Sequence, residues 1–194
     1  VIQGPVIQGW CPGALRPMLS GDGLVVRVRP MGGRLTQTQA TGIATAATRH
    51  GNGLIDLSAR GNVQLRGVTE TGHLPLVEGL RDLGLIDASI AQETRRNIVV
   101  QPFHRPDDPT LTISTELARL LALPDAPDLP GKFGFAVDTG STRVLESTAC
   151  DIRIERDHRQ RGARVDLEQV APAQRRRAAR QVDDVPRRRP RQVG

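Results

Sequence analysis

Two hydrophobic periods alternate along this chain of 194 residues. A period of two in GLVVRVRP (23–30) predicts a strand that carries Arg27 and Arg29 on one face. One or two further strands are predicted over LIDLSARGNVQLRGV (54–68). Extended segments are also predicted in RRNIVVQPF (95–103), GKFGFAVDTG (131–140) and CDIRIER (150–156).

Helical spacing separates these strands at three places. The segment 35–53 has Ile43, Ala44 and Ala47 on one stripe, with Thr36 as the expected N-cap and Gly51 as the stop. The segments 74–85 and 109–123 predict two more helices, the second capped by Ser114 or Thr115. The order β-α-β-α-β-α-β-β predicts a compact α+β fold. Its first strand–helix–strand–helix unit is half of a ferredoxin-like sandwich, which leaves a sheet edge and a sheet face to be covered.

The stretch RGNVQLRGV (60–68) places Arg60, Asn62, Gln64 and Arg66 at every second position. On a strand these four polar side chains share one face, which is costly unless the face has a ligand. Other predicted strands add Arg27 and Arg29, the pair in RRN (95–97), and Lys132, the only lysine. Taken singly, strand arginines usually lie on a solvated face. Together they predict an anion site, and because arginine binds carboxylate bidentately, a ligand with many carboxylates is the expected partner.

Charge is concentrated at one end of the sequence. The net charge is +6, and residues 157–194 account for all of it with eleven arginines against five acidic residues. This segment has few large apolar residues and no stable period, so we expect a disordered Arg-rich tail. A basic tail also keeps open the alternative of a nucleic-acid-binding protein, although aromatic interleaving is lacking.

Composition and the motifs that are missing argue against a membrane protein, a secreted protein and several classes of enzyme. No run of 18 apolar residues and no signal peptide is visible, so we expect a cytoplasmic protein without a membrane partner. Cys11 and Cys150 are expected to be unpaired thiols, and two cysteines fall short of the four thiolates of an iron–sulfur cluster. The four histidines show no metal-ligand spacing, and no P-loop, GxGxxG, HExxH or GxSxG motif is present.

Four motifs occur in the order seen in nitrite and sulfite reductases: GLVVRVRPMGG, HGNGLIDLSARGNVQLRGV, RRNIVVQPF and LPGKFGFAVDTG. The opening GWCPGALRPMLSGDGLVVRVRP and the GKFGFAVDTG variant resemble the precorrin-3B synthase family within that superfamily. The resemblance covers about residues 9–156. It implies an N-terminal arm (1–20), a ferredoxin-like half-domain (21–103), the start of a tetrapyrrole-binding 4Fe–4S domain of the siroheme-reductase type (104–156), and then the tail (157–194).

The resemblance also implies a function. Enzymes of this family hydroxylate the tetrapyrrole precorrin-3A with O₂ and form a γ-lactone in aerobic cobalamin biosynthesis. They use a [4Fe–4S] cluster, a mononuclear iron and NADH-derived electrons from a donor. Siroheme-dependent reduction of nitrite or sulfite is the second enzymatic reading.

Five residues match family positions. Arg27 matches an arginine that binds the substrate anion, and Arg96 a second one. Arg60 and Gln64 match an R-x-x-x-Q pair that contacts the macrocycle, and Lys132 matches the first lysine of a K-F-K motif. The second lysine of that motif is Gly134 here, which argues against nitrite or sulfite as substrate.

The family's cluster cysteines and second half-domain have no counterpart in this sequence. We therefore expect the N-terminal portion of a protein about twice this length, inactive by itself. The abrupt change of composition near residue 157 suggests the hypothesis of a frameshift there.

Overall fold

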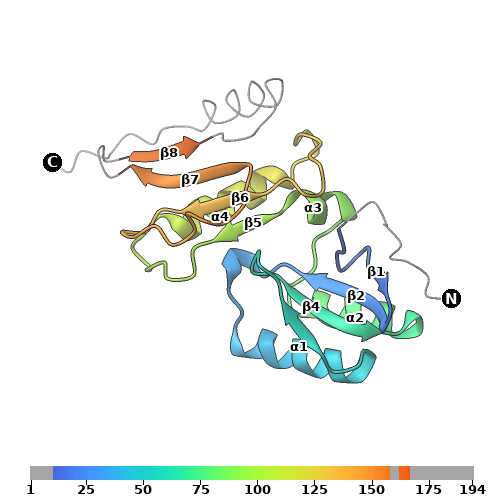
Figure 1. The fold of residues 1–194 in the computed structure, drawn as a ribbon. Coiled ribbons are helices and arrows are strands. Elements are labelled where there is room, and N and C mark those ends of the chain that lie inside the picture. Colours follow the sequence, from blue (N-terminus) through green and yellow to red (C-terminus); the bar gives the residue numbers. More distant parts are fainter. Residues whose placement is uncertain (1–10, 158–161, 167–194) are drawn as a thin grey trace.

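A computed structural model describes residues 11–157 and 162–166. Two four-stranded sheets lie one above the other in Figure 1, each with its own helices. The first unit contains β1 (Met18–Ser20), β2 (Gly23–Val28), η1 (Met31–Gly33), α1 (Gln37–His50), β3 (Ile55–Leu57), β4 (Val63–Val68) and α2 (Glu70–Asp82). The second contains α3 (Ile90–Arg95), β5 (Ile98–Val100), α4 (Thr110–Leu121), β6 (Phe135–Asp138), β7 (Ile152–Asp157) and β8 (Gly162–Asp166).

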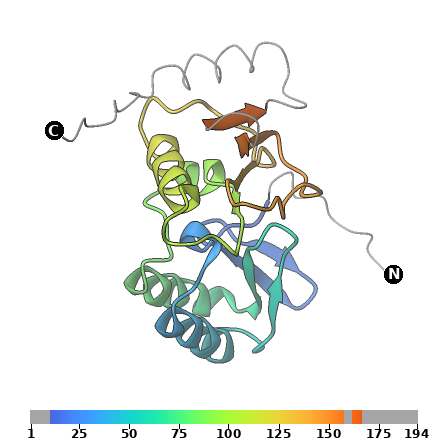
Figure 2. The same cartoon turned by 90° about the vertical axis from the view of Figure 1, so that its left-hand side faces the viewer.

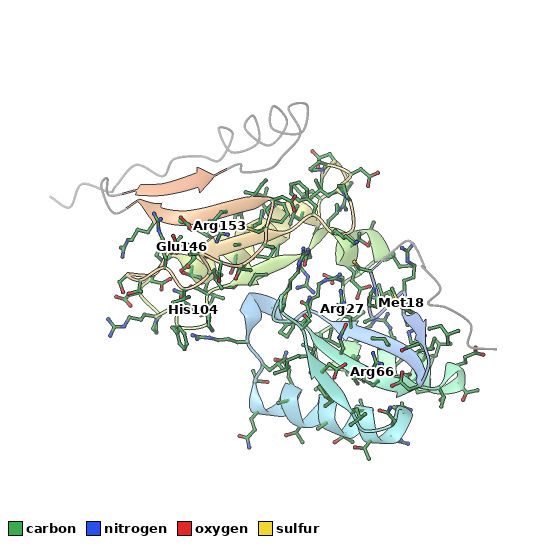
Figure 3. The ribbon with its side chains drawn as sticks, in the orientation of Figure 1. Met18, Arg27, Arg66, His104, Glu146 and Arg153 are labelled. Atoms are coloured by element: carbon green, nitrogen blue, oxygen red, sulfur yellow. The ribbon has the colours of Figure 1, made fainter. Side chains whose placement is uncertain are left out.

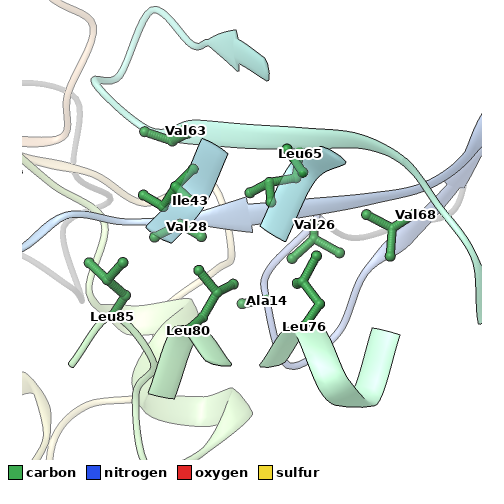
Figure 4. Close-up of a cluster of buried hydrophobic side chains, with 11 residues drawn as sticks. Ala14, Val26, Val28, Ile43, Val63, Leu65, Val68, Leu76, Leu80 and Leu85 are labelled. Carbon is green, nitrogen blue, oxygen red and sulfur yellow. The ribbon is translucent and has the colours of Figure 1, made fainter. Parts of the chain in front are cut away.

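The first sheet is antiparallel, in the order β1-β2-β4-β3. Alternate residues of β2 and β4 point to one face, where α1 and α2 cover them. Figure 4 shows this core around Val26, Leu65, Ile43 and Leu76. Val26 and Leu65 are fully buried. The residues between them, including Arg27 and Gln64, therefore lie on the opposite face, which no helix of this unit covers.

The outer end of this sheet stays open on the core side. Ile55 and Leu57 of β3 stand opposite Leu65 and Val63, so they continue the apolar layer past the helices. Leu57 is 81% exposed. The uncovered edge expected of half a sandwich is therefore present at β3.

The second sheet has the order β5-β6-β7-β8, with parallel pairing up to β7 and antiparallel pairing of β7 with β8. Helix α4 packs Leu117 and Leu121 on this sheet beside Phe133 and Phe135. β5 belongs to this sheet although it lies inside the half-domain expected over 21–103. The sheets themselves thus divide the chain before β5.

Three arginines join the two units through backbone carbonyls. Figure 2 shows the two units in a view turned by 90°, still one above the other. Arg34 of the first unit donates to the carbonyls of Pro102 and His104, at 2.6 and 3.0 Å. Arg60 donates to the Lys132 carbonyl at 3.0 Å, and Arg96 of the second unit donates to the Arg29 carbonyl at 3.0 Å. These bonds position the units around the open face of the first sheet.

Several local expectations need correction. β4 begins at Val63, because Gly61 adopts φ 66° and turns the chain there, so Arg60 and Asn62 do not lie on the strand. Within the tail expected to be disordered, residues 162–166 form β8, whose backbone pairs with β7. Residues 158–161 and 167–194 lie outside the described residues. Ser114 and Thr115 lie inside α4, which begins at Thr110.

Other expectations are confirmed. The half-sandwich order of strand, helix, strand and helix is present as β2, α1, β4 and α2. Thr36 caps α1 in a reciprocal box with Gln39.

Within residues 11–157 and 162–166, every helix is too short or too polar to span a bilayer.

Candidate functional site

The open face of the first sheet carries Arg27 beside Gln64. The two residues are directly opposite in the β2–β4 register. Nε and Nη2 of Arg27 donate to Oε1 of Gln64, at 3.1 and 2.7 Å. Figure 3 shows Arg27 between the two units. Gln64 thus fixes the orientation of the Arg27 guanidinium, which lies between the two units.

Arg60 approaches the same place from the turn before β4. Its charge lowers the pKa of Arg27, after the larger effect of burial, which places the two guanidiniums near each other. Arg60 Nη1 also lies 3.4 Å from where a Cβ of Gly134 would stand, and Asn97 Nδ2 lies 3.2 Å from it. A side chain at residue 134 would therefore press on Arg60 and Asn97. Gly134 makes the room in which Arg60 lies.

Arg29 is the least satisfied cation of this face. It is 7% exposed, and neither Nε nor Nη1 has a hydrogen-bond partner within residues 11–157 and 162–166. Burial lowers its pKa, Glu93 opposes that effect, and the charges of Arg27 and Arg96 add to it. Arginine remains charged in spite of this. A buried guanidinium with free donors is costly unless an anion accepts from it.

Arg96 lies next to Arg29 but, unlike Arg29, has hydrogen-bond partners for its Nε and Nη2. Its Nε and Nη2 donate to the two carboxylate oxygens of Asp87, at 2.7 and 2.8 Å, and Nη2 also donates to the Arg29 carbonyl. Arg96 is 8% exposed. Its geometry is that of a residue that supports the backbone of Arg29.

The remaining cations differ in their surroundings. Lys132 is exposed and meets Arg60 through its backbone carbonyl. Arg66 shares the sheet face but pairs with Asp22 at 3.1 Å and with Asp56 at 3.8 Å. Arg66 is therefore neutralised within the first unit.

The two cysteines are unpaired. Cys11 interacts electrostatically with the Arg27 guanidinium and opposes the lowering of the Arg27 pKa by burial. Burial raises the pKa of Cys150, and the charges of Arg153 and Arg60 oppose the rise. Among the described residues, no group of three or more His, Cys, Asp or Glu side chains is placed to hold a metal ion.

The structure thus brings Arg27, Arg60 and Gln64 together, with Arg96 and Lys132 at their border. Arg29 was not among the five residues predicted for the site. Alternation with Arg27 put both on one face, but only the structure shows that Arg27 has an amide partner while Arg29 keeps two free donors. We call Arg27, Arg29, Arg60 and Gln64 the arginine site.

Comparisons with known proteins agree with this architecture. Residues 16–83 match the family model described as the nitrite/sulfite reductase ferredoxin-like half domain. A curated relative named precorrin-3B synthase, from Sinorhizobium sp, is 37% identical over 153 residues, which cover 76% of this chain. The chain spans about a third (32%) of the length of that relative.

Proposed function

We propose, from the premise that residues 16–83 form a nitrite/sulfite reductase ferredoxin-like half domain, that this chain binds a carboxylated tetrapyrrole at the arginine site. The observation that carries this proposal is Arg29, a buried guanidinium whose Nε and Nη1 have no partner among the described residues and which lies near the charge of Arg27. Tetrapyrroles of the precorrin type carry several carboxylates around a flat ring. Such a ligand supplies acceptors for several guanidiniums at once.

We infer that the enzyme concerned is of the precorrin-3B synthase kind, an oxidoreductase of cobalamin biosynthesis acting with O₂ on precorrin-3A. The name of the relative supports this inference. Gly134 supports it as well, because a lysine there would crowd Arg60, whereas the glycine leaves room for the Arg60 guanidinium. This argues against the alternative of a nitrite or sulfite reductase, in which a small oxyanion needs closely gathered charge.

The chain's own residues bind and orient the ligand in this proposal. Arg29 and Arg60 donate hydrogen bonds to its carboxylates, Gln64 holds the Arg27 guanidinium in its orientation, and Arg96 donates to the backbone carbonyl of Arg29. A [4Fe–4S] cluster would supply electrons in the family. The two cysteines of this sequence do not make its four-thiolate set, so no step is assigned to a cluster here.

Binding and turnover are tested separately. Uroporphyrin, a stable carboxylated porphyrin, is titrated against the wild-type chain, Arg29→Gln and Arg27→Gln, with Arg119→Gln as the control on the exposed surface of α4. Loss of one charge-assisted contact should weaken binding about tenfold, and affinity should fall as salt rises. Equal affinities for all four proteins would refute the arginine site.

The chain alone should form no precorrin-3B from precorrin-3A with O₂ and a reductant. Product formation at a measurable rate would show that the remaining two-thirds of the relative's length is dispensable.

A further inference from the structure

The segment Cys11–Leu15 is part of the N-terminal arm expected over residues 1–20, and we call this segment alone the arm from here on. It lies along the arginine site. The Arg27 amide donates to the Gly13 carbonyl at 3.2 Å, so the arm runs beside β2. His73 Nε2 contacts the Ala14 carbonyl at 2.8 Å, and Ala14 is 1% exposed inside the first core. The arm thereby brings Cys11 near the Arg27 guanidinium, with which it interacts electrostatically.

A carboxylate from the other unit holds the arm in this position. Glu93 of α3 accepts hydrogen bonds from the amides of Ala14 and Leu15, at 2.6 and 3.2 Å. Glu93 is 5% exposed. A Cβ at Gly13 would overlap the Glu93 carboxylate, so the arm approaches as closely as a residue without a side chain permits.

The buried Glu93 carboxylate has Arg29 as a charge partner in the arginine site. Burial raises the pKa of Glu93, Asp87 adds to the rise, and the Ala14 and Leu15 amides and Arg29 oppose it. The same carboxylate therefore accepts from the arm amides and interacts electrostatically with Arg29, the residue that follows β2. Glu93 thus holds the arm and also opposes the charge of Arg29.

We propose that Glu93 is a positioning residue that clasps the arm across the two units, so that the arm, with Cys11 at its end, forms a wall of the tetrapyrrole site. This rests on the proposed function only for the identity of the ligand. The clasp itself exists with or without the ligand, because both hydrogen bonds lie within the protein. A ligand held by Arg27 and Arg29 then lies against Cys11.

Two variants break the clasp from opposite sides. Glu93→Gln keeps the shape but replaces one acceptor oxygen with a donor, so the Leu15 and Ala14 amides cannot both be satisfied. Gly13→Ala leaves the Glu93 charge in place and displaces the arm by steric overlap. Glu116→Gln, on the exposed face of α4, is the matched control for loss of a carboxylate.

The first measurement is hydrogen exchange of the segment 11–16 in the full chain. Both clasp variants should exchange the Ala14 and Leu15 amides about tenfold faster than the wild type and the control. Wild-type protection in both variants would overturn the clasp. If Glu93→Gln fails to fold, Gly13→Ala decides alone.

The second measurement is alkylation of Cys11 by iodoacetamide with and without saturating uroporphyrin. The ligand should slow Cys11 alkylation several-fold in the wild type, and this protection should be lost in Gly13→Ala at equal occupancy. Binding without any protection of Cys11 would overturn the wall while leaving the proposed function intact. Absence of uroporphyrin binding to the wild type would instead refute the proposed function, and hydrogen exchange would still decide the clasp.

Discussion

Three arginines that lie close together in space have different surroundings. Arg96 donates to Asp87 and to a backbone carbonyl, Arg27 is oriented by Gln64, and Arg29 has two donor nitrogens without a partner among the described residues. What separates them is the partner that each finds after burial, because a buried charge is stable only when its donors are used.

The Arg96–Asp87 pair should be one of the more sensitive points of the fold. Its side chains are 9% and 11% exposed, so Asp87→Asn leaves a buried charge without its counterion. We expect a loss of about 3–5 kcal/mol in the free energy of unfolding, measured in urea. The matched change Asp22→Asn breaks an ion pair whose side chains are 28% and 33% exposed, and it should cost clearly less than Asp87→Asn, because solvent screens the exposed pair. Similar losses in the two variants would contradict this assignment.

Arg29 should behave in the opposite way to Arg96. Because Nε and Nη1 of Arg29 find no acceptor in the described part of the chain, their removal offsets the lost attraction to Glu93, and Arg29→Met should lower the free energy of unfolding less than Arg96→Met does. Arg96→Met, in contrast, should cost as much as Asp87→Asn. Equilibrium unfolding of the two methionine variants separates the roles, and a large loss at Arg29 would show that it supports the fold.

Among the elements, helix α4 depends on a carboxylate before its first residue. Asp108 accepts from the Thr110 amide at 2.7 Å and from the Arg105 amide at 3.1 Å. Burial alone would raise the pKa of Asp108, but the bonds from Thr110 and Arg105 outweigh it and hold the pKa below its ordinary value. A lowered pKa means that the stabilisation is present above the unfolded value and is lost as pH falls through the folded one.

Asp108→Asn should therefore lower the free energy of unfolding by about 1 kcal/mol at pH 7. The difference from the wild type should begin to shrink as pH falls below about 4, where the carboxyl of the unfolded chain takes up a proton, and it should be lost as pH falls through the lower pKa of the folded carboxyl. Urea unfolding at several pH values measures this. A difference that stays constant with pH would mean that the charge of Asp108 has no part in the cap.

Elements with strong local signals were predictable from the sequence, and those made by partners were not. Thr36 and the stripe of Ile43 and Ala47 predict α1, because the N-cap residue and the helical spacing of the apolar residues indicate the same helix. Gly61 turns the chain before β4, which the alternation of polar residues conceals. β8 has a polar, Arg-containing sequence, and it becomes a strand because the edge of β7 offers backbone partners. The site followed the same rule, since alternation placed Arg27 and Arg29 together but could not show which one Gln64 would engage.

On the scale of the whole molecule, the second sheet ends in a strand from the segment that we expected to be disordered. Five residues of β7 pair with residues 162–166. A chain that ends at residue 156 should therefore melt several degrees below a chain that ends at residue 166, because it exposes the edge of β7. Calorimetry of the two chains measures the difference. Equal melting temperatures would show that β8 adds nothing to stability.

The ties between the two units have a consequence for how this protein tolerates sequence change. Arg34, Arg60 and Arg96 each grip a carbonyl oxygen across the boundary, and every residue type offers the same carbonyl. The residue type at Pro102, His104 and Lys132 can therefore change without loss of these bonds, as long as the backbone keeps its place. The three arginines that donate, two in the first unit and one in the second, cannot be replaced in this way, because a carbonyl across the boundary needs a side-chain donor.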